Sequence, residues 1–319
     1  MSVTFVEPNP DAGFNYPYYV STPDAADLAD HVPILVEGTN TSMATDDFET
    51  LRTEAEQRAA RGFARRVADE LGVPLLHPVF PRPRNDPVDW THYTHSLDRE
   101  TMQLSGGPLE RLDRQLLCMV EDARERVAES GIATREECCL NGFSASGTFA
   151  NRFAALHPER VLSVTAGGVN GMAILPKTEG ETSVPGVDEL PLPYPVGVTD
   201  VQELTGEPFD LDAFRSVNQF LYLGEDDDND TLLYPDAWTG PEVRLSAIFA
   251  YGEDIHEERF PSCKAAYDDV CAAAVFRVYE DTGHEPVPAF DDVVEFHRRS
   301  IAGDDIEEIR EHIGGTTLA

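Results

Sequence analysis

The sequence predicts a mostly parallel α/β sheet with helices on both faces. Short, near-continuous apolar runs alternate along the chain with longer segments in which apolar residues recur at helical spacing. The apolar runs lack the polar alternation of strands that face water on one side, so they indicate strands buried on both faces. The 319 residues, 41% of them hydrophobic, suffice for one large core. We therefore expect a single domain over residues 1–319.

The elements follow one another in a regular order. Strands are expected at residues 31–37, 73–80, 137–141, 161–166, 218–223 and 275–279. Helices are expected at residues 46–71, 109–130, 148–157, 241–250, 259–273 and 290–309. Gly72, Gly131 and Pro158 follow the first three helical patterns and predict their ends. Residues 167–216 are rich in Gly and Pro, and we interpret this long excursion between two strands as a small cap-like insertion.

The chain is strongly acidic. It has 59 acidic against 24 basic residues, a net charge of −35, and its only lysines are Lys177 and Lys264. Self-repulsion of this size destabilises a folded protein in dilute buffer, whereas near 1 M salt the screening length falls to about 3 Å. The composition resembles that of proteins from salt-in halophiles, particularly haloarchaea. The charge argues against nucleic acid or an anionic membrane as partner.

The sequence has no pattern typical of a membrane span, a signal peptide or a metal site. No 18-residue apolar stretch occurs, and residues 1–14 carry a glutamate and prolines where a signal peptide needs a basic flank and an apolar core. We therefore expect a soluble, cytoplasmic protein. The five cysteines include no Cys-x-x-Cys pair, so they predict neither a disulfide framework nor a zinc site. No metal or organic cofactor is expected.

The stretch from Leu140 to Thr148 follows an apolar run and contains two serines among small residues. In a nucleophile elbow, the residues two before and two after the reactive serine must be small, because the turn brings them together. Ser144 has Gly142 and Ser146 at those positions, whereas Ser146 has Ser144 and the β-branched Thr148. The pattern favours Ser144 as nucleophile; the alternative is a serine-rich turn that only caps the following helix.

A serine hydroxyl needs a base, and the base needs an orienting acid. His284 follows the last expected strand behind a glycine. Asp227 lies in the acidic loop after the strand at 218–223, with Asp226 and Asp228 as alternatives. The order Ser, Asp, His, each after a strand, is that of the α/β-hydrolase arrangement. Calcium binding by the acidic loop is a weaker interpretation, since the glycine and terminal glutamate of a calcium loop are absent.

An oxyanion hole requires backbone N–H groups directed at the developing negative charge. One donor is expected from Ala145, the residue after the nucleophile. The second is expected from the loop after the first strand, at Thr39 or alternatively Asn40.

At this point the sequence resembles the α/β-hydrolases, within the esterase and polyhydroxybutyrate-depolymerase-like group. The resemblance covers roughly residues 30–300 and is carried by residues 142–147, 151–160, 222–227 and 283–284. It implies an ester hydrolase with Ser144, Asp227 and His284 as catalytic triad. Two positions depart from the family pattern: Glu37 precedes Gly38 where histidine is usual, and Ser146 replaces the last glycine of the elbow.

Two segments of the sequence are candidates for binding the substrate. Residues 89–99 join a strand to a helix at the site end of the sheet, and Trp90, Tyr93 and His95 could line a pocket there. Met172, in the expected cap, would also face the substrate. The alternative is ordinary loop packing; metal binding by His92 and His95 lacks a third ligand. The expected function is hydrolysis of a small-molecule carboxylic ester, with a peptidase, a polyester depolymerase or a non-catalytic binding protein as alternatives.

Overall fold

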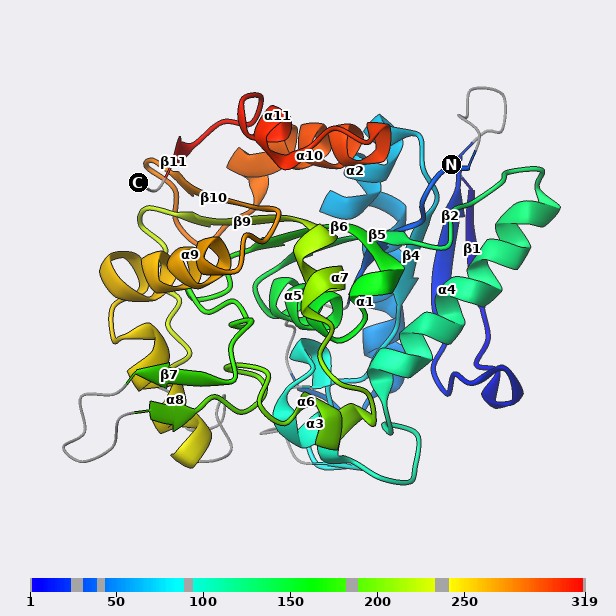
Figure 1. Ribbon diagram of the computed structural model, residues 1–319. Coiled ribbons are helices and arrows are strands. Elements are labelled where there is room, and N and C mark those ends of the chain that lie inside the picture. The colour runs from blue at the N-terminus through cyan, green and yellow to red at the C-terminus, as the bar shows by residue number, and fades with distance from the viewer. Residues whose placement is uncertain are drawn as a thin grey trace.

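The computed structural model describes residues 2–23, 31–38, 44–88, 94–181, 189–232 and 241–317. Within these residues one nine-stranded sheet crosses the molecule (Figure 1). Its strands are β1 (Ser2–Val6), β2 (Tyr18–Thr22), β4 (Leu75–Pro78), β3 (Leu35–Glu37), β5 (Cys138–Phe143), β6 (Val161–Gly167), β9 (Asn218–Gly224), β10 (Ala274–Tyr279) and β11 (Thr316–Thr317), in spatial order. Neighbours from β4 to β10 are parallel, and the pairs made by β1, β2 and β11 are antiparallel.

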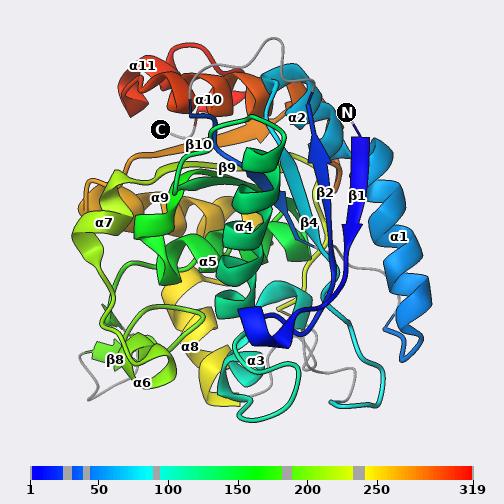
Figure 2. The same cartoon turned by 90° about the vertical axis from the view of Figure 1, so that its right-hand side faces the viewer.

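Helices cover both faces of the sheet (Figures 1 and 2). On one face lie α1 (Phe48–Arg61), α2 (Phe63–Leu71), α10 (Phe290–Ala302) and α11 (Ile306–Arg310). On the other lie α4 (Leu112–Glu129), α5 (Ala145–Leu156) and α9 (Phe260–Asp269). The predicted fold class is therefore confirmed.

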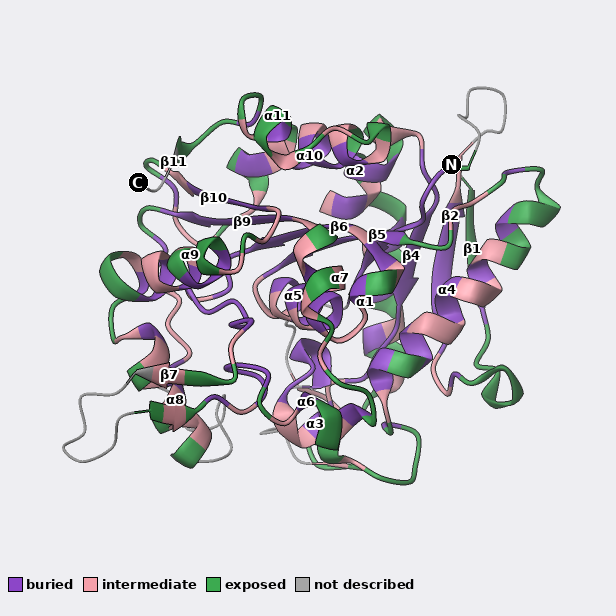
Figure 3. Ribbon diagram, in the orientation of Figure 1, coloured by how far each residue is buried: buried purple, intermediate pink, exposed green. Residues whose placement is uncertain are grey.

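The core lies on both sides of the parallel strands, which are almost entirely buried (Figure 3). Phe220 of β9 packs on Phe296 of α10, with ring centroids 5.4 Å apart. On the other face, Phe149 and Phe153 of α5 stack at 6.1 Å. Fully burying one such side chain contributes about 1.5–3 kcal/mol to folding.

The helix predicted over residues 46–71 is in fact two helices. Gly62 has an extended backbone, with φ −69° and ψ 179°, and separates α1 from α2. A Cβ at this position would lie 2.6 Å from the carbonyl oxygen of Arg58, so only glycine fits the close turn. The break directs the end of α1 and the start of α2 toward the carboxyl ends of the strands. Gly303 similarly divides the predicted helix at 290–309.

Two excursions leave the sheet. The first, within the predicted insertion at 167–216, holds a hairpin of β7 (Glu179–Glu181) and β8 (Glu189–Pro191), then α6 (Val201–Thr205) and α7 (Leu211–Ser216). The second lies between β9 and β10 and holds α8 (Pro241–Tyr251), the π-helical turn η6 (Ile255–Arg259) and α9. The short helix α3 (Arg99–Gln103) lies beside α6 (Figure 1). In the described ranges, no helix has the length and apolarity that a membrane span requires.

Candidate functional site

Ser144 stands on a sharp turn between β5 and α5. Its φ of +59° and ψ of −129° are rarely adopted by a residue with a side chain. The turn holds this conformation through backbone hydrogen bonds: the Ser144 N–H donates to Gly167 O at 2.8 Å, and the Thr148 N–H donates to Ser144 O at 2.9 Å. Such a strained residue directly after a buried strand has the backbone of a nucleophile elbow.

The neighbours of Ser144 are small for a steric reason. A Cβ on Gly142 would lie 2.2 Å from Ser146 O, and one on Gly147 would lie 2.8 Å from Gly167 O. Ser146 is buried, and its hydroxyl accepts a hydrogen bond from Phe143 N at 3.0 Å and donates to Phe143 O at 2.9 Å. Ser146 therefore closes the turn, while Ser144 occupies its apex.

The structure brings Asp227 and His284 together from two different loops. Nδ1 of His284 lies 2.9 and 3.0 Å from the two carboxylate oxygens of Asp227. The Asp227 side chain is 4% exposed and that of His284 is 26% exposed, so a buried acid supports a histidine that is open to the pocket. The two rivals from the same loop, Asp226 and Asp228, are exposed. The imidazole ring also packs on Phe143 of β5, at a centroid distance of 4.7 Å.

The loops that carry these two residues are joined by their backbones. The N–H groups of Glu225 and Asp226 donate to Tyr279 O at 2.9 Å and to Thr282 O at 2.8 Å. This approach is possible because residue 224 is glycine: a Cβ there would lie 2.1 Å from Thr282 O. The distance between Asp227 and His284 is thus set by backbone contacts between the loops that follow β9 and β10, and not by the two side chains alone.

Residues of η6, in the second excursion, also contact the loop that carries Asp227. His256 Nε2 lies 3.0 Å from the backbone carbonyl oxygen of Asp227. Arg259, which is 1% exposed, forms a bidentate ion pair with Asp230 at 2.8 and 2.9 Å. Paired and hydrogen-bonded groups of this kind favour one conformation of the loop around the buried Asp227.

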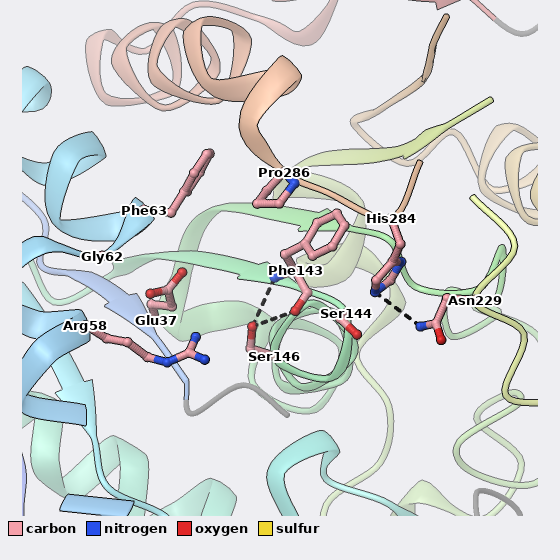
Figure 4. A pocket seen from close by; sticks show the side chains of 10 residues that line it. All are labelled: Glu37, Arg58, Gly62, Phe63, Phe143, Ser144, Ser146, Asn229, His284 and Pro286. Carbon is pink, nitrogen blue, oxygen red and sulfur yellow. Dashed lines mark hydrogen bonds between the residues drawn. The ribbon is translucent and has the colours of Figure 1, made fainter. Parts of the chain in front are cut away.

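Ser144 and His284 line the same pocket, which has a volume of about 430 Å³ (Figure 4). Asn229 lies beside His284, and its Nδ2 is 3.2 Å from His284 Nε2. Among the described residues no hydrogen bond joins Ser144 to His284. The remaining lining residues are Glu37, Arg58, Gly62, Phe63, Phe143, Ser146 and Pro286.

The other predicted site residues have different positions. Ala145 is the first residue of α5, where a backbone N–H has no acceptor within the helix, so this donor is available beside Ser144. Thr39, its alternative Asn40, Trp90 and Tyr93, together with His92, lie outside the described residues. His95 is buried in the turn at Thr94–Ser96, and Met172 is buried in the core. Neither of these two is among the pocket-lining residues, and the Met172 side chain packs in the hydrophobic core instead.

Several pocket residues were not predicted from the sequence. Arg58 and Phe63 reach the site only because the chain breaks at Gly62, and a continuous helix gives no signal of that. Asn229 is two residues from Asp227, and the acidic loop offered no reason to single it out. Glu37 was noted only as a departure from a family pattern.

Glu37 is a buried carboxyl group in the pocket wall. Its Oε1 accepts a hydrogen bond from Asn141 Nδ2 at 2.9 Å, and Asn141 Oδ1 in turn accepts one from the Thr165 hydroxyl at 2.8 Å. Thr165 Oγ1 lies 3.2 Å from Nε2 of the buried His297, so a row of polar side chains crosses β3, β5 and β6 to reach α10. Burial raises the pKa of Glu37 from 4.5 to about 7, although the charge of Arg58 opposes the rise.

This raised pKa makes a testable contribution to stability. A carboxyl group that binds its proton more tightly when folded stabilises the protein fully below its unfolded pKa, near 4.5, and that contribution is lost as pH rises through about 7. The difference corresponds to about 3 kcal/mol. A glutamine at this position stays uncharged at every pH, so Glu37→Gln should not show this loss of stability. Measured by denaturant unfolding, the free energy of unfolding of the variant should rise by about 3 kcal/mol relative to that of wild type between pH 4 and pH 8.

Glu56 of α1 is exposed and provides the matched control. Glu56→Gln should change the free energy of unfolding by no more than about 0.5 kcal/mol at either pH. A Glu37→Gln variant whose difference from wild type is the same at both pH values would contradict the buried, proton-binding environment of Glu37.

No three His, Cys, Asp or Glu side chains converge on a possible metal position anywhere in the part of the chain that the structure describes. All five cysteines are described and unpaired; Cys138, Cys139 and Cys263 are buried, whereas Cys271 is exposed.

No protein-family model and no curated protein sequence matches this chain. Solved structures do match. The poly(3-hydroxybutyrate) depolymerase LpqC of Bordetella parapertussis is 17% identical with a TM-score of 0.53, over 97% of this chain and 94% of that chain. Poly(aspartic acid) hydrolase-1 of Sphingomonas sp. KT-1 is 16% identical with a TM-score of 0.49, over 94% of this chain and 95% of that chain.

The strand order and the likeness to the depolymerase define the class: the chain has an α/β-hydrolase fold. At 17% identity the likeness shows the fold alone. What the protein does must therefore be argued from its site.

Proposed function

We propose that this protein is a serine hydrolase that cleaves carboxylic esters through an acyl-enzyme. The observation that carries the proposal is the contact of His284 Nδ1 with both oxygens of the Asp227 carboxylate, beside a pocket that His284 and Ser144 line. A base oriented by a buried acid next to a hydroxyl on a strained turn is the arrangement that nucleophilic acyl transfer requires.

In the proposed reaction, the Ser144 hydroxyl oxygen attacks the ester carbonyl carbon while His284 Nε2 accepts its proton. The Ala145 N–H donates to the resulting oxyanion. The tetrahedral intermediate expels the alcohol, which takes the proton from His284, and an acyl-Ser144 remains. Water then attacks this acyl group with His284 again as base, which releases the acid and restores Ser144.

The hydrogen bond between Asn229 and His284 engages the nitrogen that acts as base in the proposed reaction. When Nδ1 carries its proton and donates to Asp227, Nε2 accepts from the Asn229 amide. For turnover, Nε2 must exchange this partner for the Ser144 hydroxyl. Ligand-free active sites often show such loosened geometry, and substrate binding tightens it.

An ester is the proposed substrate because an alcohol leaves an intermediate more readily than an amine. An ester therefore needs less activation by one base and one nucleophile than an amide does.

Covalent labelling tests this proposal directly. We expect a fluorophosphonate probe to modify the protein in molar KCl, a condition suited to its net charge of −35, and tryptic mass spectrometry should place the adduct on Ser144. The probe reports an activated serine independently of the choice of substrate. Modification of Ser146 instead, or no labelling of folded protein, would overturn the assignment.

A further inference from the structure

The pocket has two walls of different chemistry (Figure 4). Ser144, His284 and Asn229 form the reactive wall. Glu37 of β3 and Arg58 of α1 lie together on the opposite wall, next to Gly62 and Phe63. The reaction proposed above uses only the first wall, so the charged residues of the second have no role yet.

Arg58 is unusual among the arginines of its helix. Arg52 pairs with Glu49 at 2.7 Å, and Arg61 donates to Gln57 at 3.3 Å. The Arg58 guanidinium makes neither a hydrogen bond nor an ion pair with any residue of the described ranges, and the side chain extends into the pocket (Figure 4). Other buried or partly buried arginines also lack a carboxylate partner, but Arg152 and Arg277 donate to backbone carbonyl oxygens. The Arg58 guanidinium, which is partly buried, has no such acceptor in the described ranges.

Glu37 does not supply the missing partner. No ion pair joins it to Arg58 in the described part of the chain, and its carboxyl group instead accepts the hydrogen bond from Asn141. Because burial keeps Glu37 partly protonated near neutral pH, the positive charge of Arg58 is only partly compensated. The wall therefore presents a positive charge to the pocket.

A guanidinium group is planar, permanently charged, and carries parallel N–H donors that match the two oxygens of a carboxylate. Phe63 and Gly62 line the pocket beside Arg58 and add apolar surface there. An acyl chain that reached from Ser144 to the opposite wall would place a terminal carboxylate at Arg58.

We propose that Arg58 binds a free carboxylate on the substrate, so that the enzyme prefers esters with an anionic acyl chain over neutral esters of equal length. This inference rests on the proposed ester hydrolysis and specifies its substrate class. The local positive charge also offsets the repulsion that a chain of net charge −35 exerts on an anionic substrate.

Glu37 makes the preference depend on pH. The groups that face it are Arg58 of α1, Asn141 of β5, His77 of β4 and Tyr222 of β9. Burial lowers the pKa of His77 to about 3, so His77 is neutral and adds no compensating charge. When Glu37 ionises above about pH 7, its carboxylate competes with the substrate for Arg58. The preference should therefore weaken as pH rises.

A matched pair of activated esters tests the proposal: 4-nitrophenyl hydrogen adipate and 4-nitrophenyl methyl adipate, which differ in the terminal charge. We expect wild type to favour the anionic ester in kcat/KM. Arg58→Gln should lower the anionic-to-neutral ratio by about 10- to 100-fold, the effect of losing a charge-assisted hydrogen-bond pair. Arg61→Gln, an exposed change on the same helix, should leave the ratio within about twofold.

Two further readouts make the result decisive. The ratio should fall between pH 6 and pH 8 in wild type but not in Glu37→Gln. Calorimetry of the Ser144→Ala protein with 4-nitrophenyl hydrogen adipate measures binding without turnover, and adding Arg58→Gln should weaken that binding about tenfold or more. An unchanged ratio and unchanged binding in the Arg58 variants would overturn the carboxylate site. Loss of Ser144 labelling would instead overturn the hydrolase proposal, so the two failures are distinguishable.

Discussion

Ser144→Ala is expected to reduce kcat for an activated ester by about 10⁵- to 10⁶-fold, the scale found when the nucleophile of another serine hydrolase is removed. The alanine lacks the oxygen that forms the acyl-enzyme, and water cannot occupy the same position with the same alignment. The positive φ of residue 144 comes from the surrounding turn, which alanine retains, so the fold should persist. Steady-state kinetics in molar KCl, together with a denaturant unfolding curve, measure both effects.

Ser146→Ala is the matched control. The Ser146 hydroxyl has both of its hydrogen bonds with the backbone of Phe143, so its loss should cost about 1 kcal/mol of stability. Catalysis should remain within about tenfold of wild type, because the rest of the turn is held by the backbone bonds of Ser144 and Thr148. If Ser146→Ala lost esterase activity and Ser144→Ala kept it, the assignment of the two serines would be reversed.

The sheet was predictable from sequence because its strands are buried on both faces and therefore read as apolar runs. The antiparallel pair β1 and β2 was not predicted. Its outer strand is largely exposed and mixes polar with apolar residues, which leaves no continuous signal. The helix break at Gly62 was also missed, because a single glycine inside a strong helical pattern does not reveal whether the chain turns.

The sharp turn at Ser144 was the most predictable part of the candidate site, since most of its steric constraints are local. A Cβ on Gly142 would clash with Ser146 O, four residues away, whereas the constraint on Gly147 comes mainly from Gly167 O of the neighbouring strand β6. Arg58 and Glu37 belong to the opposite case. The position of Arg58 depends on how α1 packs on β2 and β4, and no local pattern encodes that packing. Glu37 ends a predicted strand, but nothing in its local sequence shows that its carboxyl group lines a pocket.

The sequence left open which of the consecutive residues Asp226, Asp227 and Asp228 orients the histidine. Substituting each of them in turn gives the second large expected effect. Asp227→Asn should lower kcat by about 10⁴-fold, as the corresponding change does in another serine hydrolase. An asparagine amide would donate to His284 Nδ1, forcing its proton to Nε2, where it blocks acceptance of the Ser144 proton. The loop itself should stay in place, since His256, Arg259 and the Gly224 turn hold it through other atoms.

Asp226→Asn and Asp228→Asn remove the same charge from the same loop without touching His284. Both side chains are exposed, so each variant should keep kcat within about twofold of wild type and unfold at nearly the same denaturant concentration. This comparison separates a specific hydrogen bond from a general effect of loop charge. If all three variants lost activity equally, the acidic loop would act through its summed field, and the contact between Asp227 and His284 would not be what orients the base.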